Sequence, residues 1–366
     1  MTIHQAMIRT TLSVALILAM VNAFIVPRTT TTVPSQSRLS AAQLLEFQEP
    51  QTGVRVILVG AMHYNPASIQ LAKDTIERLG KENRLGSVVV ESCDIRWNKT
   101  AELYAEKPLL KKILNNEMRA ACDTALAFDR PVVLGDQRIN VTVDALQSSL
   151  KETFQDLINP PAGWKKFMGE VQTAWKETVP FGGDGYLSAF AFFDPRLLLV
   201  LPVSLFKYPL SYLVRDPVPT TIGLTLLGAL SFLDDPVSLQ SYMAENSISV
   251  TDCLLSICFA VLETAVFARL LLKPLLAERN EILAKSILDQ CKIYASKKKP
   301  SRSFLGLDWF GVPVSDQRAP SAMAVYAPGS KIVASTENSE KVVVAVLGMA
   351  HCNGIKKLLT ESQFTS

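Results

Sequence analysis

Histidine is the rarest residue in this 366-residue chain, which holds only His4, His63 and His351. Cysteine is also sparse, with six residues and no C-x-x-C pair. Without close pairs or dense spacing, a disulfide framework is not expected, and a reducing compartment suits the chain better than the extracellular space.

Neither sign of charge predominates, because the formal net charge is only +3. The one basic run, Lys297–Lys299 with Arg302, lies beside Pro300 and is typical of a solvated loop. No basic tract is interleaved with aromatic residues, so we expect no nucleic-acid partner.

Acidic residues are absent before Glu46. An apolar stretch, Leu12–Met20, and the small residue Ala23 predict a signal peptide over 1–23. Residues 24–45 are acid-free and rich in Ser and Thr, as transit peptides are. Together the two segments resemble the bipartite presequence of red-lineage secondary plastids. We therefore expect a plastid location, the alternative being a secreted or endomembrane protein with a disordered linker.

Two β-branched runs each end in the same motif. Val54–Val59 leads into Gly60-Ala-Met-His63, and Lys341–Leu347 leads into Gly348-Met-Ala-His351. Each pattern predicts a buried strand that delivers an imidazole at its carboxyl end. We expect each glycine to let the backbone turn sharply and to let a ligand approach closely. Both histidines outside the leader thus occupy the same place in a repeated G-x-x-H motif.

Two further strands are predicted, and each ends on an acid: Ser87–Glu91 and Arg130–Asp136. A helix capped by Asn65 or Ser68 follows the first strand, and strand, helix, strand indicates a parallel βαβ unit. We therefore predict an α/β fold with a largely parallel central sheet flanked by helices, its core formed by 50–158 and 271–360. Ligands bind at the carboxyl ends of such strands. We therefore expect the residues at the four strand ends to lie close together, namely His63, Glu91, Asp136 and His351.

The middle of the chain contains several apolar segments, but none is as long as a membrane-spanning helix. Residues 159–186 are rich in Pro, Gly and Trp and predict an irregular connector. Residues 187–270 form an inserted apolar helical block, whose charge-free segments are Leu197–Phe206, Val218–Leu233 and Cys253–Leu262. None reaches the roughly 18 to 20 residues of a spanning helix. The block is either a buried subdomain or membrane-associated, and its clustering favours membrane lipid as a partner.

Two imidazoles and the carboxylate of Glu91 make an N/N/O set suited to a divalent ion such as zinc, manganese or cobalt. Each residue also has a structural alternative. A histidine at a strand end can cap a helix, and Glu91 can cap a helix or pair with Arg96. Asp136 is a common turn residue. Arg279 is either exposed or a buried charge held by Glu91 or Asp136.

The motifs together resemble TraB-domain proteins, which include the bacterial pheromone-shutdown proteins and are similar to Tiki-type membrane metalloproteases. The residues that carry the resemblance are Gly60–Ser68, Val88–Glu91 with Arg96, Leu134–Arg138, Glu278–Asn280 and Val346–Ile355. The resemblance implies an α/β core, frequent membrane attachment and a metal-dependent, hydrolase-like site. The internal apolar block and Gln137, which interrupts an expected Gly-Asp-Arg run, depart from the family pattern.

Carried over by position, the resemblance implies metal ligands His63, Glu91 and His351 and catalytic roles for Glu91 and Arg279. Supporting roles fall on Gly60, Arg96, Asp136, Arg138 and Gly348. The expected function is a membrane-associated, peptidase-like hydrolase acting on a peptide or protein. The alternative is a non-catalytic tether or regulatory binding protein with the same fold.

Overall fold

The computed structural model describes residues 43–178, 185–218, 268–298, 323–325 and 340–361, with positions 220, 221, 225, 258, 262 and 264–266 between them. The chain forms two compact units. An α/β unit comprises Gln36–Ala145, Glu177–Tyr208 and Leu276–Ser366, and a helical unit includes Leu146–Lys176 and Pro209–Leu275. The predicted leader up to residue 42 and most of the segments 218–233 and 253–262 lie outside the described residues.

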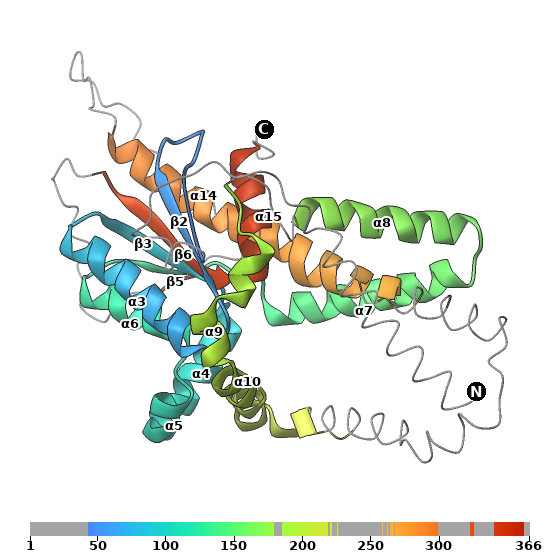
Figure 1. Cartoon of the computed structure of the whole chain (residues 1–366), viewed down its shortest axis with the longest axis horizontal. Coiled ribbons are helices and arrows are strands. Elements are labelled where there is room, and N and C mark those ends of the chain that lie inside the picture. The colour runs from blue at the N-terminus through green and yellow to red at the C-terminus, as the bar shows by residue number, and fades with distance from the viewer. Residues whose placement is uncertain are drawn as a thin grey trace, which may run out of the picture. The chain divides into compact units, whose positions relative to one another are not determined.

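The α/β unit contains a sheet with the strand order β1-β2-β6-β3-β4-β5 (Figure 1). The bounds are β1 Leu44–Gln48, β2 Arg55–Ala61, β3 Leu85–Val90, β4 Val132–Leu134, β5 Met323–Val325 and β6 Val342–Gly348. Strands β2, β6, β3 and β4 run parallel, whereas β1 and β5 pair antiparallel at the edges. The predicted α/β class with a largely parallel sheet is confirmed.

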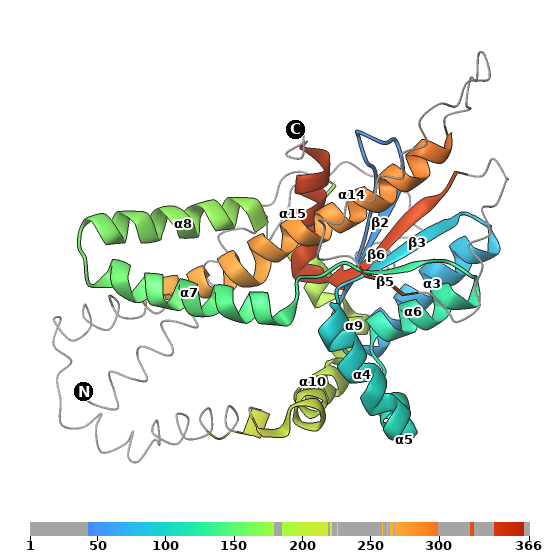
Figure 2. The ribbon, with the colours of Figure 1, turned by 180° about the vertical axis from the view of Figure 1, so that it is seen from behind.

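The central strands form because their apolar runs are buried on both faces. Every residue of β3 and β6 is buried, as expected for parallel strands that helices cover on both sides. Helices α3 (Pro66–Lys81) and α6 (Glu117–Ala127) pack on one face. Helices α14 (Glu278–Lys298) and α15 (Met349–Thr360) pack on the other, which gives three layers (Figures 1 and 2).

The remaining described helices are divided between the α/β unit and the helical unit. They are α4 Asp94–Glu106, α5 Pro108–Ile113, α7 Ile139–Leu157, α8 Ala162–Thr178, η1 Ala189–Phe193, α9 Pro195–Leu199, α10 Leu201–Arg215 and the π-helix η2 Leu271–Ala277. Within the described residues no single helix is long and apolar enough to cross a membrane. One pair, Ala189–Leu199 with Leu201–Arg215, passes that test jointly but is bent by 91°.

Three predicted boundaries are wrong. Leu44 and Leu45 belong to β1, not to the transit-like segment, because they pair with β2. Helix α15 starts at Met349, so His351 lies in a first helical turn and not in a loop after the strand. The predicted connector 159–186 contains α8, because Gly163, Phe167 and Ala174 recur on one buried helical face and the two prolines precede the helix.

Candidate functional site

Three neighbouring strands bring the predicted ligands together. Strand β6 lies between β2 and β3, with Ala61 paired to Gly348 and Val90 paired to Val346. His63 and Glu91 follow the ends of β2 and β3, and His351 follows the end of β6. Because the three strands are parallel, these side chains all lie at the carboxyl edge of the sheet.

Gly348 marks the point where the three side chains meet. A Cβ atom at this position would lie 3.2 Å from Glu91 Oε2, 3.5 Å from His63 Nε2 and 3.6 Å from His351 Cδ2. The backbone here has φ −58°, which any residue adopts, so the expectation of a glycine-dependent sharp turn is wrong. The glycine instead leaves space among the ligands. Gly60 serves packing, because its Cβ would meet Met349, Leu187 and Cys352 at 3.1–3.3 Å.

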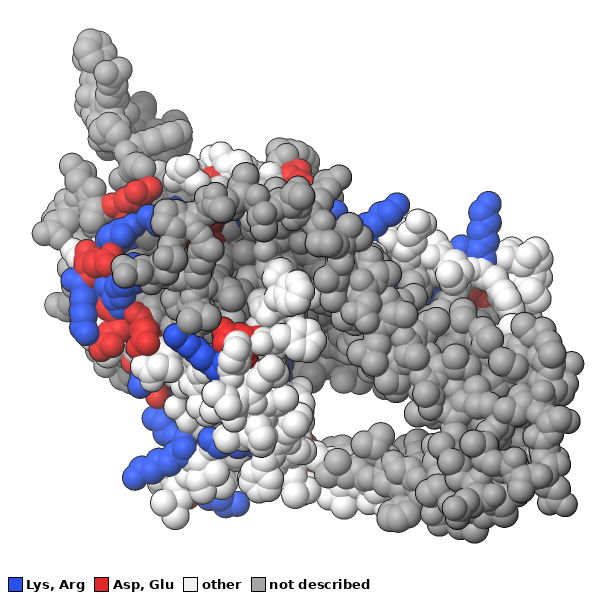
Figure 3. All heavy atoms as spheres, in the orientation of Figure 1, with Lys and Arg blue, Asp and Glu red and all other residues white. Residues whose placement is uncertain are grey.

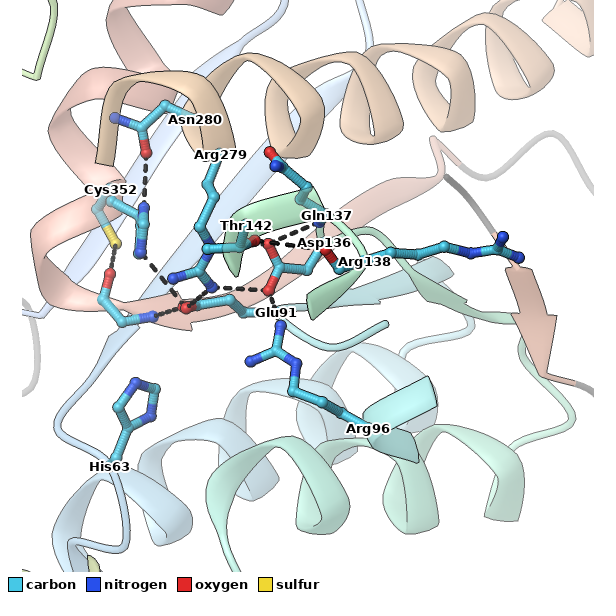
Figure 4. Close-up of polar contacts among 12 residues, drawn as sticks. His63, Glu91, Arg96, Asp136, Gln137, Arg138, Thr142, Arg279, Asn280 and Cys352 are labelled. Atoms are coloured by element: carbon cyan, nitrogen blue, oxygen red, sulfur yellow. Dashed lines mark hydrogen bonds and ion pairs between the residues drawn. The ribbon is translucent and has the colours of Figure 1, made fainter. Parts of the chain in front are cut away.

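Glu91 is buried at the centre of the site (Figure 4). Its Oε2 accepts a hydrogen bond from the Gly348 backbone at 2.7 Å, and its Oε1 accepts one from Arg279 Nη2 at 2.5 Å. His351 Nε2 lies 3.4 Å from Oε1. Burial alone would raise the pKa of Glu91, but His351, Arg279 and His63 outweigh it and hold the pKa well below its usual range. Glu91 is therefore a carboxylate, and it neither caps α4 nor pairs with Arg96.

His63 is held by a residue that the sequence did not reveal as part of the site. Its Nδ1 lies 2.6 Å from Glu117 Oε1, and Glu117 Oε2 accepts the Tyr64 backbone N–H at 3.0 Å. Burial lowers the pKa of His63, but Glu117 and Glu91 overcome this effect and raise the pKa to about 9. The other ring nitrogen, Nε2, faces the space at Gly348.

Asn280 holds His351 in an equivalent way. Its Oδ1 lies 2.7 Å from His351 Nδ1, and both side chains are buried. An amide oxygen only accepts hydrogen bonds, so His351 Nδ1 carries the proton and Nε2 faces Glu91. Both histidines thus anchor Nδ1 and direct Nε2 inward. In metal sites, hydrogen-bond partners of the ligating imidazoles produce the same orientation.

Asp136 joins the site through Arg279. Arg279 Nε donates to Asp136 Oδ1 at 3.0 Å, and Nη2 donates to Oδ2 at 2.7 Å. Arg96 also pairs with Asp136, which is fully buried. Of the two alternatives for Arg279, the buried charge is therefore confirmed, with both acids as partners. Asp136 is therefore not only a turn residue, because its carboxylate pairs with Arg279 and Arg96.

Arg138 is the one predicted supporting side chain that the structure does not bring to the site. It forms a bidentate pair with Asp94, at 3.1 and 2.6 Å, and half of its side chain is exposed. Figure 4 shows it pointing away from Glu91. Between Asp136 and Arg138, the backbone N–H of Gln137 donates to Asp136 Oδ1 at 2.8 Å.

The donor types fit a divalent ion, but the geometry is not that of a compact ligand cage. Among the residues described, no three His, Cys, Asp or Glu side chains already form a metal-binding group. Both Glu91 oxygens accept protein hydrogen bonds, so an ion would share this carboxylate with Arg279 and the Gly348 backbone. The chain offers an ion the space at Gly348 and the two Nε2 atoms. Because the pKa of His63 is about 9, an ion would displace the proton from His63 Nε2.

Comparison with known proteins returned no relative of this chain. No protein-family model, no curated protein and no solved structure matches it. The resemblance to TraB-domain proteins therefore stays a prediction from the motif residues.

A pH-dependent contribution to stability is expected from His63 and Glu117. The folded pKa of His63, about 9, exceeds the ordinary 6.5, so this contribution is complete below pH 6.5 and is lost as pH rises through 9. In metal-free protein, the free energy of unfolding should fall over this window, and the fall should be shallower in Glu117→Gln. Denaturant unfolding at several pH values measures both slopes, and equal slopes would contradict the pairing.

Proposed function

We propose that this protein is a TraB-like, membrane-associated and metal-dependent hydrolase of the peptidase type, located in a plastid. The observation that supports the proposal most is the meeting of His63, Glu91 and His351 around Gly348, from three separate parts of the chain. Two oriented imidazoles and an ionised carboxylate at the carboxyl edge of a parallel sheet are typical of a catalytic site.

His63 Nε2, His351 Nε2 and the Glu91 carboxylate would hold the ion, with zinc, manganese and cobalt as the candidates. The chemistry that such an ion supplies when bound is polarisation of a carbonyl and a lower pKa for water. Glu117 and Asn280 orient the two rings. Because the pKa of Glu91 is held low, this residue suits a ligand better than a general base. Arg279 places positive charge beside the site, where it would stabilise a developing oxyanion.

Metal analysis of the purified full chain tests the proposal. We expect near-stoichiometric divalent metal in the wild type and its loss in His63→Ala and in His351→Ala, because each variant removes one nitrogen ligand. Arg138→Ala is the matched control, since this arginine pairs with Asp94 outside the site and should leave the metal content unchanged. Equal trace metal in all four proteins would refute a metal centre.

Gly348→Ala is expected to weaken metal affinity by about tenfold, the size of effect seen when ligand orientation is disturbed. The added methyl group would enter the space among the three ligands, at 3.2–3.6 Å from them. Titration with zinc against a competing chelator measures the affinity. Gly169→Ala is the control, because a Cβ there meets nothing within 4 Å. An unchanged affinity in Gly348→Ala would place the ion elsewhere.

A second candidate is a non-catalytic tether or regulatory binding protein. The observation that favours it is that both oxygens of Glu91 already accept protein hydrogen bonds. In that case the Glu91, Arg279 and Asp136 network would only hold the sheet edge together. The metal analysis separates the two functions, because the tether requires no bound ion.

A further inference from the structure

The segment from η1 to the start of α10 exposes most of its large apolar side chains, although Leu197 is buried. Exposed fractions are 82% for Leu199, 65% for Leu205 and 69% for Phe206, whereas the polar Ser204 is only 4% exposed. Phe190 and Phe193 of η1 are also more than half exposed. A surface helix in water shows the reverse pattern, with its apolar stripe toward the core. This inverted surface indicates that the segment meets an apolar environment.

The charges on and near this segment complement an anionic surface. Arg196 and Lys207 lie within it, whereas its one acid, Asp194, is buried and caps α9 by accepting the Arg196 backbone N–H at 2.8 Å. Helix α5 lies on the same side of the sheet in both ribbon views and adds exposed Leu109 beside Lys112 (Figures 1 and 2). Figure 3 shows basic side chains over α5, next to the uncharged surface over α10.

Apolar and aromatic side chains bordered by basic ones are typical of elements that lie in a membrane interface. The 91° bend between the two parts of the segment is compatible with lying along a bilayer surface and not with a straight span. Anionic lipid is therefore the occupant that both the apolar area and the charges favour.

The same segment contacts the loop that carries His63. The Tyr208 ring stacks on the His63 ring with centroids 6.1 Å apart and an interplanar angle of 19°, and it meets Tyr64 edge-on. Asn65 Nδ2 donates to the Leu197 carbonyl at 3.1 Å, which fixes α9 to the start of α3. A surface docked through this segment would consequently border the His63 side of the site.

We propose that η1, α9 and the first turns of α10 dock on the surface of an anionic bilayer, with the His63 side of the site facing that surface. If the protein is the hydrolase proposed above, this placement also defines its class of substrate. The site would act on peptide segments that lie at or emerge from the membrane surface, because those are the segments that reach His63 past Tyr208.

The test uses the full chain with Cys253 and Cys258 replaced by serine, since the other cysteines are buried. A polarity-sensitive dye is attached to Leu199→Cys, to Phe206→Cys or, as a control, to Glu77→Cys on exposed α3 surface. Vesicles of phosphatidylcholine with phosphatidylglycerol should shift the dye emission at 199 and 206 to shorter wavelength and roughly double its intensity. The emission of the dye at 77 should not change. Vesicle binding without any change at 199 and 206 would overturn the docking surface.

Modification of His63 by diethyl pyrocarbonate, followed by mass spectrometry of its peptide, tests the link to the site. We expect vesicles to slow modification of His63 in the wild type. Tyr208→Ala should speed modification without vesicles, because the stacked ring is removed. An unchanged His63 rate in docked protein would overturn the assigned orientation. Neither measurement needs a metal or catalysis, so a failure here leaves the metal analysis standing, and a failed metal analysis leaves the docking intact.

Discussion

Replacement of Arg279 by alanine is expected to destabilise the α/β unit by about 3–5 kcal/mol, the usual cost of leaving a buried charge without its partner. The Arg279 guanidinium neutralises two carboxylates, Glu91 and Asp136, whose side chains are 5% and 0% exposed. Without it, both acids stay buried with less compensation. The free energy of unfolding from denaturant titration of the wild type and the variant measures the effect.

Arg138→Ala provides the matched control for Arg279. Its ion pair with Asp94 is half exposed, and such surface pairs contribute less than about 1 kcal/mol. Arg138→Ala should therefore unfold close to the wild type. A comparably small loss of stability in Arg279→Ala would show that water or rearranged side chains replace the guanidinium, and would contradict the network.

Arg269→Ala is expected to have a similar effect, about 3–5 kcal/mol, within the helical unit. The Arg269 side chain is fully buried, and it donates to Asp156 Oδ2 at 2.7 Å and to Glu170 Oε2 at 2.9 Å. Its guanidinium carbon also lies 5.4 Å from the centre of the Phe167 ring. Arg269 is thus the fully buried cation among those that join the end of α7 to α8, because Lys166 and Lys273 reach the same acids from partly exposed side chains. Its loss leaves Asp156 and Glu170 close together with only these weaker partners.

Hydrogen exchange resolved by peptide locates this second effect. Backbone amides of α7 and α8 should lose protection in Arg269→Ala. Lys166→Ala is the control, because Lys166 approaches the same acids at 3.7–3.9 Å from a side chain that is 52% exposed. Unchanged protection in Arg269→Ala would mean that packing, not the ion network, holds these helices.

The sheet and the ligand positions could be predicted from sequence because their signals are local. Continuous apolar runs mark strands that are buried on both faces, and Gly-x-x-His follows two of them directly. The Asn65 cap of α3 was also predictable, and its Oδ1 accepts from Ala67 N at 3.0 Å. Because these strands are parallel, the residues at their carboxyl ends all lie at one edge of the sheet.

Glu117 and Asn280 could not be predicted as site residues, because their roles depend on contacts across 54 and 71 positions of chain. Glu117 lies at the start of a helix that otherwise carries charge outward, where an acid is normally solvated near the positive helix end. Nothing in the sequence around Glu117 indicates that its side chain is fully buried. Asn280 stood within a recognised motif, but only the fold shows that it orients His351.

The position of β6 has a consequence for synthesis of the protein. Strand β6, the last described strand, lies between β2 and β3, which are made about 290 and about 260 residues earlier. Until it leaves the ribosome, these two strands present bare hydrogen-bonding edges and share no partner. The nascent chain therefore needs protection from aggregation until β6 has been made, and a copy that terminates before β6 lacks the middle of its sheet as well as His351.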